Sequence, residues 1–300
     1  MKAHNKKLII TGANGFIGSA LVNRALEEGW QVRGLVRDLK EVDTSLPVSW
    51  HEWSFLEPIP EEALYDTPDV LIHAAYEMRP NDSKKAAKIN VEGSLRLFEE
   101  ARTHGISKIV FLSSMSAHEG ALSWYGKTKR HLEQQLSREK DLVIRAGLVI
   151  GNGGLFKRMA SAIRKTGLAP VFFGGNQKIQ TIAVEDLSYG IMKAVEKGLS
   201  GTLYLAEPNA HTLEEFYRSI GAVCNRRVRV IPLPGGLTLF FLRVCEKLRI
   251  SLPITSENLL GLKALRAEKI ERDIEKIGVQ PKSMYSALEA YAKTYESKRA

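Results

Sequence analysis

The segment Lys7-Leu-Ile-Ile-Thr-Gly-Ala-Asn-Gly-Phe-Ile-Gly18 decides the fold that we expect for this chain. It opens with a short apolar strand, and helical spacing of apolar residues then runs from Phe16 to Glu28 and stops at Gly29. Glycines at such a turn allow a tight bend, a close approach of pyrophosphate to the backbone, and close packing of the helix. Free N–H groups at the helix start favour an anion. The segment predicts a dinucleotide site at Gly12, Asn14, Gly15, Phe16, Ile17 and Gly18.

The rest of the first half alternates apolar runs with helical patterns. Strands are expected at 31–36, 49–55, 70–74, 108–112 and 142–144, and helices at 89–104 and 124–139. This rhythm is typical of an α/β fold with a doubly wound parallel sheet, the Rossmann arrangement. After residue 150, glycine pairs and a Pro-Leu-Pro-Gly-Gly run separate shorter elements. We therefore predict a dinucleotide-binding domain over 1–150 and a smaller C-terminal α/β substrate domain over 151–300, with segments that return to the first.

The composition excludes several classes of protein. The 300 residues are 44% hydrophobic and 26% charged, which is ordinary for a soluble globular protein. Two cysteines, Cys224 and Cys245, give neither a disulfide framework nor a zinc spacing, and His118, His131 and His211 lack partners at ligand spacing. We expect no metal site. The start of the chain shows no signal peptide and no apolar run is long enough to span a membrane, so a cytoplasmic location is expected.

The formal net charge of +9 favours an anionic partner without choosing one. The basic residues are scattered and form no stripe with interleaved aromatics, so a small anionic substrate is preferred over nucleic acid. The segment Leu237–Leu248 reads as a strongly apolar helix. We expect it in a core or an interface, and a membrane-surface or dimer role is the alternative.

Two pairs of residues carry the predicted chemistry. Arg37 ends the second strand, where an arginine suits the 2′-phosphate of NADP, whereas Asp38 at the next position would suit the ribose of NAD. NADP is favoured over NAD.

Tyr125 and Lys129 lie four residues apart and so share a helix face. A nearby ammonium group lowers the pKa of a phenol, which makes it a usable acid or base near neutral pH.

Taken in order, these motifs resemble the short-chain dehydrogenases/reductases. The resemblance rests on the glycine loop, His73-Ala-Ala75, Asn90, Ser113–Ser114, Tyr125 with Lys129, and Arg145-Ala-Gly-Leu-Val-Ile-Gly151. The last of these and Thr181-Ile-Ala-Val-Glu-Asp186 are similar to the extended, NAD-dependent epimerase/dehydratase branch.

The resemblance implies roles for individual residues. Ser114 would hydrogen-bond the substrate oxygen, Tyr125 would exchange a proton with it, and Lys129 would bind the nicotinamide ribose. His73 and Asn90 would belong to the cofactor-binding residues, with His73 packed against the cofactor loop and Asn90 opening a helix in a mainly structural role. The further implied contacts are Ala74, Ala75, Ala146 and Val149 for the cofactor, and Tyr76 and Ser116 for the substrate, with Ser116 a rival to Ser114.

The expected activity is hydride transfer at a carbinol or ketone carbon of a nucleotide-sugar or similar substrate, as an oxidoreductase or an epimerase. The connection between Ser114 and Tyr125 is short for nucleotide-sugar epimerases, and Ala146 stands where many relatives carry proline. These departures keep open an NADPH-dependent carbonyl reductase resembling dihydroflavonol reductases. A non-catalytic dinucleotide-binding module is the second alternative, and a homodimer is compatible with the family.

Overall fold

The computed structural model describes residues 6–78, 82–250, 252 and 254–297. The chain forms two compact units. The first comprises Met1–Ser114, Thr128–Arg145 and Ser188–Leu203, and the second comprises Met115–Lys127, Ala146–Leu187 and Tyr204–Ala300. The units are interleaved along the sequence, so their bounds do not follow a single cut at residue 150. The functional division into two domains stays a prediction.

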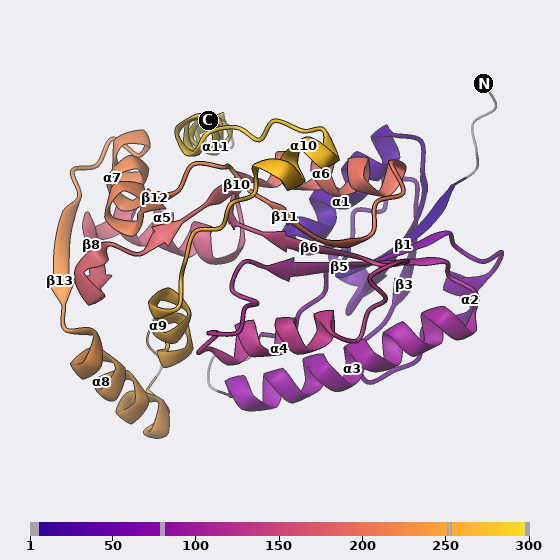
Figure 1. Ribbon diagram of the computed structural model, residues 1–300, viewed down its shortest axis with the longest axis horizontal. Helices are drawn as coiled ribbons and strands as arrows, with labels where there is room; N and C mark the ends of the chain where they lie inside the picture. The colour runs from indigo at the N-terminus through magenta and orange to yellow at the C-terminus, as the bar shows by residue number, and fades with distance from the viewer. Residues whose placement is uncertain (1–5, 79–81, 251, 253, 298–300) are drawn as a thin grey trace. The chain divides into compact units, whose positions relative to one another are not determined.

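A seven-stranded sheet has the order β11-β6-β5-β4-β1-β2-β3 (Figure 1). The pairings β1–β2, β2–β3, β1–β4 and β4–β5 are all parallel. The chain moves outward from β1 to β3 and then returns to β4 on the other side of β1, so the direction of winding reverses between β1 and β4. Ligands of open α/β sheets bind at such a reversal, beyond the carboxyl ends of the strands. The predicted fold class is confirmed. The strands are β1 (Lys7–Thr11), β2 (Gln31–Val36), β3 (Val48–Glu52), β4 (Val70–His73), β5 (Lys108–Ser114), β6 (Leu142–Ala146) and β11 (Gly201–Leu205).

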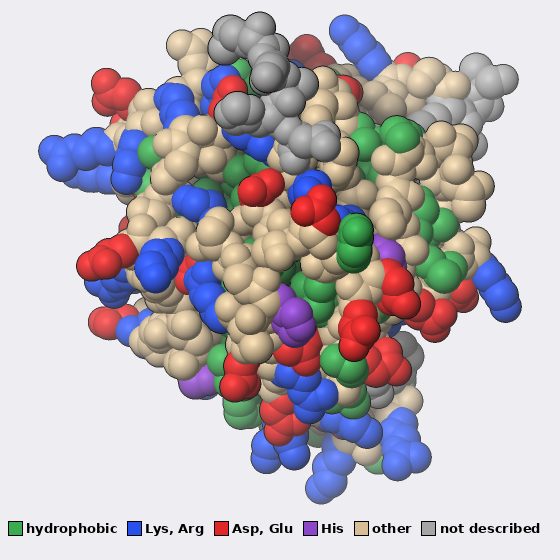
Figure 2. All heavy atoms as spheres, turned by 90° about the vertical axis from the view of Figure 1, so that its right-hand side faces the viewer, with side chains coloured by type: hydrophobic (Ala, Val, Ile, Leu, Met, Phe, Trp, Pro, Cys, Tyr) green, Lys and Arg blue, Asp and Glu red, His purple; other side chains and the backbone are tan. Residues whose placement is uncertain are grey.

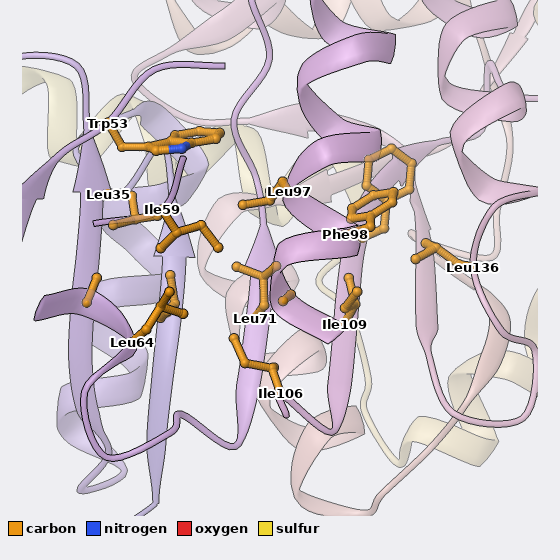
Figure 3. Close-up of a cluster of buried hydrophobic side chains, with 14 of the residues drawn as sticks. Leu35, Trp53, Ile59, Leu64, Leu71, Leu97, Phe98, Ile106, Ile109 and Leu136 are labelled. Atoms are coloured by element: carbon orange, nitrogen blue, oxygen red, sulfur yellow. The ribbon is translucent and has the colours of Figure 1, made fainter. Parts of the chain in front are cut away.

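Helices cover both faces of this sheet, with α1 (Phe16–Glu27) on one side and α3 (Ser83–Thr103) on the other (Figure 1). Because both faces are covered, the strands are continuous apolar runs, and Leu8, Ile9 and Ile10 are fully buried. Figure 3 shows the core on the α3 side, where Leu97 of α3 meets Leu71 of β4. This unit also contains the short helix α2 (Glu61–Leu64), the 3₁₀ turn η1 (Leu39–Glu41) and most of α4 (Trp124–Glu133) and α6 (Val184–Glu196).

The second unit has its own core. Phe156 packs its ring against Tyr291 at 4.8 Å and against Phe216 at 6.1 Å. Three small sheets pair β7 with β10 and β8 with β13 in parallel, and β9 with β12 in antiparallel. The strands are β7 (Leu148–Ile150), β8 (Leu168–Phe172), β9 (Lys178–Ile179), β10 (Thr181–Ala183), β12 (His211–Thr212) and β13 (Arg229–Leu233). The helices are α5 (Gly154–Thr166), α7 (Leu213–Val223), α8 (Gly235–Lys247), α9 (Ser256–Lys263), α10 (Glu271–Ile277) and α11 (Met284–Ser297), with the 3₁₀ turn η2 (Phe173–Gly175).

Two helix boundaries differ from those expected. Helix α3 begins at Ser83, because the Asp82 carboxylate accepts the Lys85 N–H and caps the helix there. Helix α4 ends at Glu133, well before residue 139. The residues that follow turn instead, and the Ser137 N–H donates to Asp141 at 2.8 Å. A capping carboxylate sets the start of α3 and a turn sets the end of α4, so the spacing of apolar residues misplaced both ends.

On the face shown in Figure 2, Lys and Arg side chains lie interspersed with Asp and Glu. Among the residues that the structure describes, no helix combines the length and the apolar character needed to cross a bilayer.

Candidate active site

The glycine turn after β1 has a backbone that side chains would obstruct. Gly12 has a φ of +65°, a conformation that residues with a side chain rarely adopt. A Cβ on Gly18 would lie 1.9 Å from the Gly12 carbonyl oxygen, and one on Gly15 would lie 3.0 Å from the same atom. A backbone hydrogen bond joins the turn to β2, because the Gly12 N–H donates to the Leu35 carbonyl at 2.9 Å. The three glycines therefore produce a compact loop that brings the start of α1 against the end of β1.

The first turn of α1 is suited to an anion. Gly15 is its N-cap residue, and within the described part of the chain no side chain caps this helix and no acidic residue lies in its first turn. N–H groups at such a helix start carry partial positive charge and favour phosphate. Asn14 and Gly15 are exposed here, while Phe16 and Ile17 are half-buried. These residues fit the pyrophosphate of a dinucleotide.

Beyond β2, Arg37 and Asp38 have separate partners. Arg37 donates to the Glu77 carboxylate at 3.1 Å, and its side chain is still 77% exposed. One Asp38 oxygen accepts the Lys40 N–H at 2.8 Å and so starts the turn η1. The guanidinium is available to solvent, whereas the aspartate is partly used by its own backbone. Glu77 was not among the predicted site residues, and 40 positions separate it from Arg37, so sequence spacing gives no sign of the pair.

His73 joins β1, β4 and α3 through a buried network. Its Nδ1 lies 2.7 Å from the Thr11 hydroxyl and its Nε2 lies 2.8 Å from the Ser94 hydroxyl. The same Thr11 hydroxyl accepts the Ala75 N–H at 3.1 Å, which fixes the backbone that follows β4 beside the glycine turn. Burial, with a smaller contribution from the Lys129 charge, lowers the pKa of His73 to about 3. His73 is therefore a neutral structural group near neutral pH.

Asn90 lies inside α3 and does not open that helix, which corrects the expected position. Its side-chain oxygen accepts the Glu77 N–H at 2.8 Å, and its amide donates to the Glu77 and Ala86 carbonyls at 2.9 and 2.7 Å. These bonds hold the segment after β4 in one conformation. Ala74, Ala75 and Tyr76 in this segment are each half-buried.

Lys129 is buried at the end of β5. Its Nζ donates to the Leu112 carbonyl at 2.6 Å and lies 4.6 and 5.0 Å from the ring centroids of Phe111 and Tyr76. The side chain is 3% exposed, and burial lowers the pKa of Lys129 to about 7, with the Glu133 carboxylate partly offsetting this. Burying a lysine here has a cost in stability, which is typical of functional positions.

Tyr125 belongs to the same helix as Lys129, four residues earlier, so both lie on one face of α4. Tyr125 is 37% exposed. Within the second unit, a Cβ on Gly126 would lie 2.4 Å from the Ser116 carbonyl, so the loop that carries Ser116 packs tightly on the first turn of α4. Ser116 is half-buried, as is Ser114 at the end of β5 in the first unit. The bond from the Met115 N–H to the Ala146 carbonyl, at 3.0 Å, places Ala146 next to the backbone at Met115, and Val149 lies three residues further on in β7.

A mostly buried ion pair holds the end of α4 and was not predicted. Arg145 donates to both carboxylate oxygens of Glu133, at 3.0 and 2.6 Å, and both side chains are mostly buried. Ser113 donates to Glu133 at 2.5 Å, so its side chain faces this pair. Successive strand residues point to opposite faces, which directs Ser114 away from Glu133. Glu133 follows Lys129 by four residues and so lies on the same face of α4.

Two hollows in the described part of the chain lie away from the glycine turn. One is lined by charged residues at the end of α4, including Arg130, Glu133 and Arg138, and another lies along α7 near Thr212 and Glu215. Neither is lined by the glycine turn. Among the described residues, no group of three or more metal-ligating side chains could hold a metal ion.

Comparison with known proteins gives consistent matches. The model of the NAD dependent epimerase/dehydratase family matches residues 8–206. The chain is 28% identical to the ceramide reductase of Caulobacter vibrioides over 76% of this chain and 74% of that protein. It is 25% identical to the decarboxylating sterol-4-alpha-carboxylate 3-dehydrogenase of Dictyostelium discoideum over 79% and 83%, respectively. The structure of a Thermotoga maritima UDP-glucose 4-epimerase with UDP-glucose has a TM-score of 0.76 at 19% identity, covering 98% of this chain and 100% of that one, and shows a shared fold.

Proposed function

The chain belongs to the NAD dependent epimerase/dehydratase family, and from this premise we propose that it transfers hydride at a carbinol or ketone carbon with Ser114, Tyr125 and Lys129 as its reactive groups. The observation that carries the proposal is the burial of Lys129, one helical turn after Tyr125, at the end of the strand that carries Ser114. Burying a lysine costs stability. A tyrosine–lysine pair that only decorated the protein surface would not require this burial.

The residues present fit a nicotinamide dinucleotide. The glycine turn leaves the space that side chains would fill, and the uncapped start of α1 suits a pyrophosphate. When bound, the nicotinamide supplies or accepts the hydride. Arg37 would hold a 2′-phosphate and Lys129 the ribose of the nicotinamide half.

Proton transfer belongs to the protein's own residues. Tyr125 donates its phenolic proton to the substrate oxygen in reduction and takes it back in oxidation. The positive charge of the ammonium form of Lys129 favours the phenolate form of Tyr125. Ser114 hydrogen-bonds the same substrate oxygen and stabilises the negative charge that develops there. His73 takes no part in this transfer, because it is buried and both of its ring nitrogens are hydrogen-bonded, to the Thr11 and Ser94 hydroxyls.

For the cofactor we propose NADP. Arg37 presents an exposed guanidinium whose planar fork suits phosphate, while Asp38 already accepts a backbone N–H. Glu77 balances the Arg37 charge until a phosphate replaces it, so the preference for NADP over NAD is expected to be moderate.

For the reaction we propose net oxidoreduction of a hydroxyl or ketone group. The support is that two relatives matched over most of their length have a reductase and a dehydrogenase as their named activities. Their names also favour an apolar substrate such as a long-chain or sterol ketone. Epimerisation of a nucleotide sugar is the second candidate, supported by the shared fold with an epimerase that binds UDP-glucose.

Replacing Tyr125 with Phe tests the proposal. Turnover of NADPH with a long-chain ketone as the probe should fall about 100-fold or more, the typical contribution of a general acid. Affinity for NADPH should stay the same. Tyr65→Phe is the matched control, since Tyr65 is exposed and lies outside the proposed site. Unchanged turnover in Tyr125→Phe would refute the assignment.

The two reactions differ in their use of the cofactor. Oxidoreduction consumes NADPH in proportion to product, whereas epimerisation regenerates the cofactor in each cycle and proceeds without added nucleotide. Conversion of UDP-glucose with no consumption of cofactor would overturn the oxidoreductase proposal in favour of the epimerase.

A further inference from the structure

Helix α8 presents apolar side chains on two opposite sides. On the inner side Leu242 and Cys245 are buried, and Leu242 forms a small core cluster with Phe172 of β8 and Leu259 of α9. A helix on the surface of a globular protein normally carries polar residues on its outer side, and a helix that is apolar all round is normally buried. The outer side of α8 follows neither pattern.

Four large apolar residues on the outer side of α8, together with Leu248 at its C-cap, form what we call the α8 stripe: Leu237, Phe240, Phe241, Val244 and Leu248. Their spacing of three, four, seven and eleven residues from the first places them on one helix face. Leu237 is 71% exposed, Phe240 70% and Leu248 65%. Single exposed apolar residues are common, but a continuous apolar face marks a site of interaction with something outside the chain.

The exposed charges that α8 itself carries beside the α8 stripe are positive, while the half-buried Glu257 of α9 interacts with Arg243 and accepts the Trp124 N–H at 2.6 Å. Arg243 and Lys247 follow Phe240 by three and seven residues and so border the stripe, and both are exposed, as is Arg249 just beyond the helix. The acidic residue of α8, Glu246, is turned inward, where it accepts the Ser256 N–H at 2.6 Å and the Ser256 hydroxyl at 2.7 Å. The outer side of α8 therefore combines exposed apolar side chains with a basic border.

We propose that the α8 stripe docks this protein on the surface of a lipid bilayer rich in anionic headgroups. A helix with aromatic and leucine residues on one face and basic residues at its border lies in the plane of the interface, with the apolar side chains below the headgroups. Arg243 and Lys247 have long apolar stems that let their charged ends reach the phosphates. The excess of basic residues over the whole chain, a net charge of +9, adds attraction at longer range.

A second copy of the chain fits the α8 stripe less well. In a two-fold dimer the same patch meets itself, so the basic borders of the two stripes would come close and repel. Anionic headgroups neutralise those borders. The inference is independent of the proposed chemistry, because binding to a bilayer needs neither cofactor nor substrate.

Cosedimentation of the full-length protein with vesicles tests the proposal. We expect binding to vesicles of phosphatidylcholine with phosphatidylglycerol, weaker binding in high salt, and little binding to phosphatidylcholine alone. Phe240→Ser with Phe241→Ser should weaken binding about 100-fold or more through lost apolar burial. The control pair Leu56→Ser with Tyr65→Ser, also exposed but in the first unit, should bind like the wild type.

A second pair of variants keeps the test valid if the serine variant folds poorly. Arg243→Gln with Lys247→Gln leaves the apolar residues in place and should weaken binding about 30-fold, at roughly 1 kcal/mol for each basic residue near an anionic surface. Arg226→Gln with Arg227→Gln is its control, since both residues are exposed and lie outside α8. The proposal is overturned if the wild type does not bind anionic vesicles, or if the serine variant abolishes a dimer in analytical ultracentrifugation while vesicle binding is unchanged.

Discussion

Replacing Lys129 with Met should stabilise the fold near neutral pH while it abolishes the proposed activity. The Lys129 side chain is 3% exposed, and burial lowers its pKa from 10.5 to about 7. One pH unit corresponds to about 1.36 kcal/mol, so keeping this side chain buried in its charged form costs on the order of 5 kcal/mol at low pH. Methionine has a similar length and carries no charge, and it removes this cost.

The direction of the pH dependence follows from proton binding. Between about pH 7 and 10.5 the unfolded chain binds more protons at Lys129 than the folded chain does, so wild-type stability rises with pH in this range. The cost is about 4 kcal/mol at pH 7 and about 2 kcal/mol at pH 9. The variant loses the bond to the Leu112 carbonyl, which lies 2.6 Å from Nζ, and this loss costs about 1–3 kcal/mol. The variant should therefore gain about 1–3 kcal/mol at pH 7 and about 0 at pH 9.

Urea denaturation of both proteins at the two pH values, followed by circular dichroism, measures these differences. Lys127→Met is a matched control on the same helix, because Lys127 is exposed, and it should show no such pH-dependent gain. A Lys129→Met variant that is destabilised equally at both pH values would refute the reasoning, because the lysine would then have no cost of burial.

Other variants test the loop, the cofactor preference and the support of α4. Gly18→Ala places a Cβ 1.9 Å from a loop carbonyl oxygen. This variant should lose NADPH binding, and its unfolding free energy in urea denaturation should fall by about 1–3 kcal/mol. Gly236→Ala places its Cβ in open space and should show neither effect. Arg37→Ala should weaken NADPH about tenfold, the equivalent of 1.4 kcal/mol, and leave NADH unchanged in a calorimetric titration. Arg145→Met leaves Glu133 buried without its partner and should cost about 3–5 kcal/mol in unfolding free energy, while adding Glu133→Leu should recover part of it.

The fold was predictable because its deciding signals are local. The run from β1 through the glycine turn to α1 combines a buried strand, a glycine at positive φ and an apolar helix face within about twenty residues of one another. The boundaries of α3 and α4 were not, because a capping carboxylate and a turn rather than apolar spacing set them. The same reason explains why Asn90 was expected at a helix start and lies in the interior of α3.

The candidate site was predictable as a set of residue types and not as a set of contacts. Spacing alone places Tyr125 and Lys129 on one helix face, but nothing local indicates that Lys129 reaches the Leu112 carbonyl. The pair of Arg37 with Glu77 likewise joins segments 40 residues apart. The helix over 237–248 was expected in a core or an interface, with a membrane-surface or dimer role as the alternative. Apolar spacing alone did not show that Leu242 and Cys245 are buried while Leu237 and Phe240 stay exposed.

Titration of the purified protein with NADPH, followed by the fluorescence of the reduced nicotinamide, tests the dinucleotide site most directly. We expect saturable binding of one NADPH per chain that is lost in Gly18→Ala. Absence of binding by both NADPH and NADH to a folded wild-type protein, or equal binding by wild type and Gly18→Ala, would contradict the site on which the proposed chemistry depends.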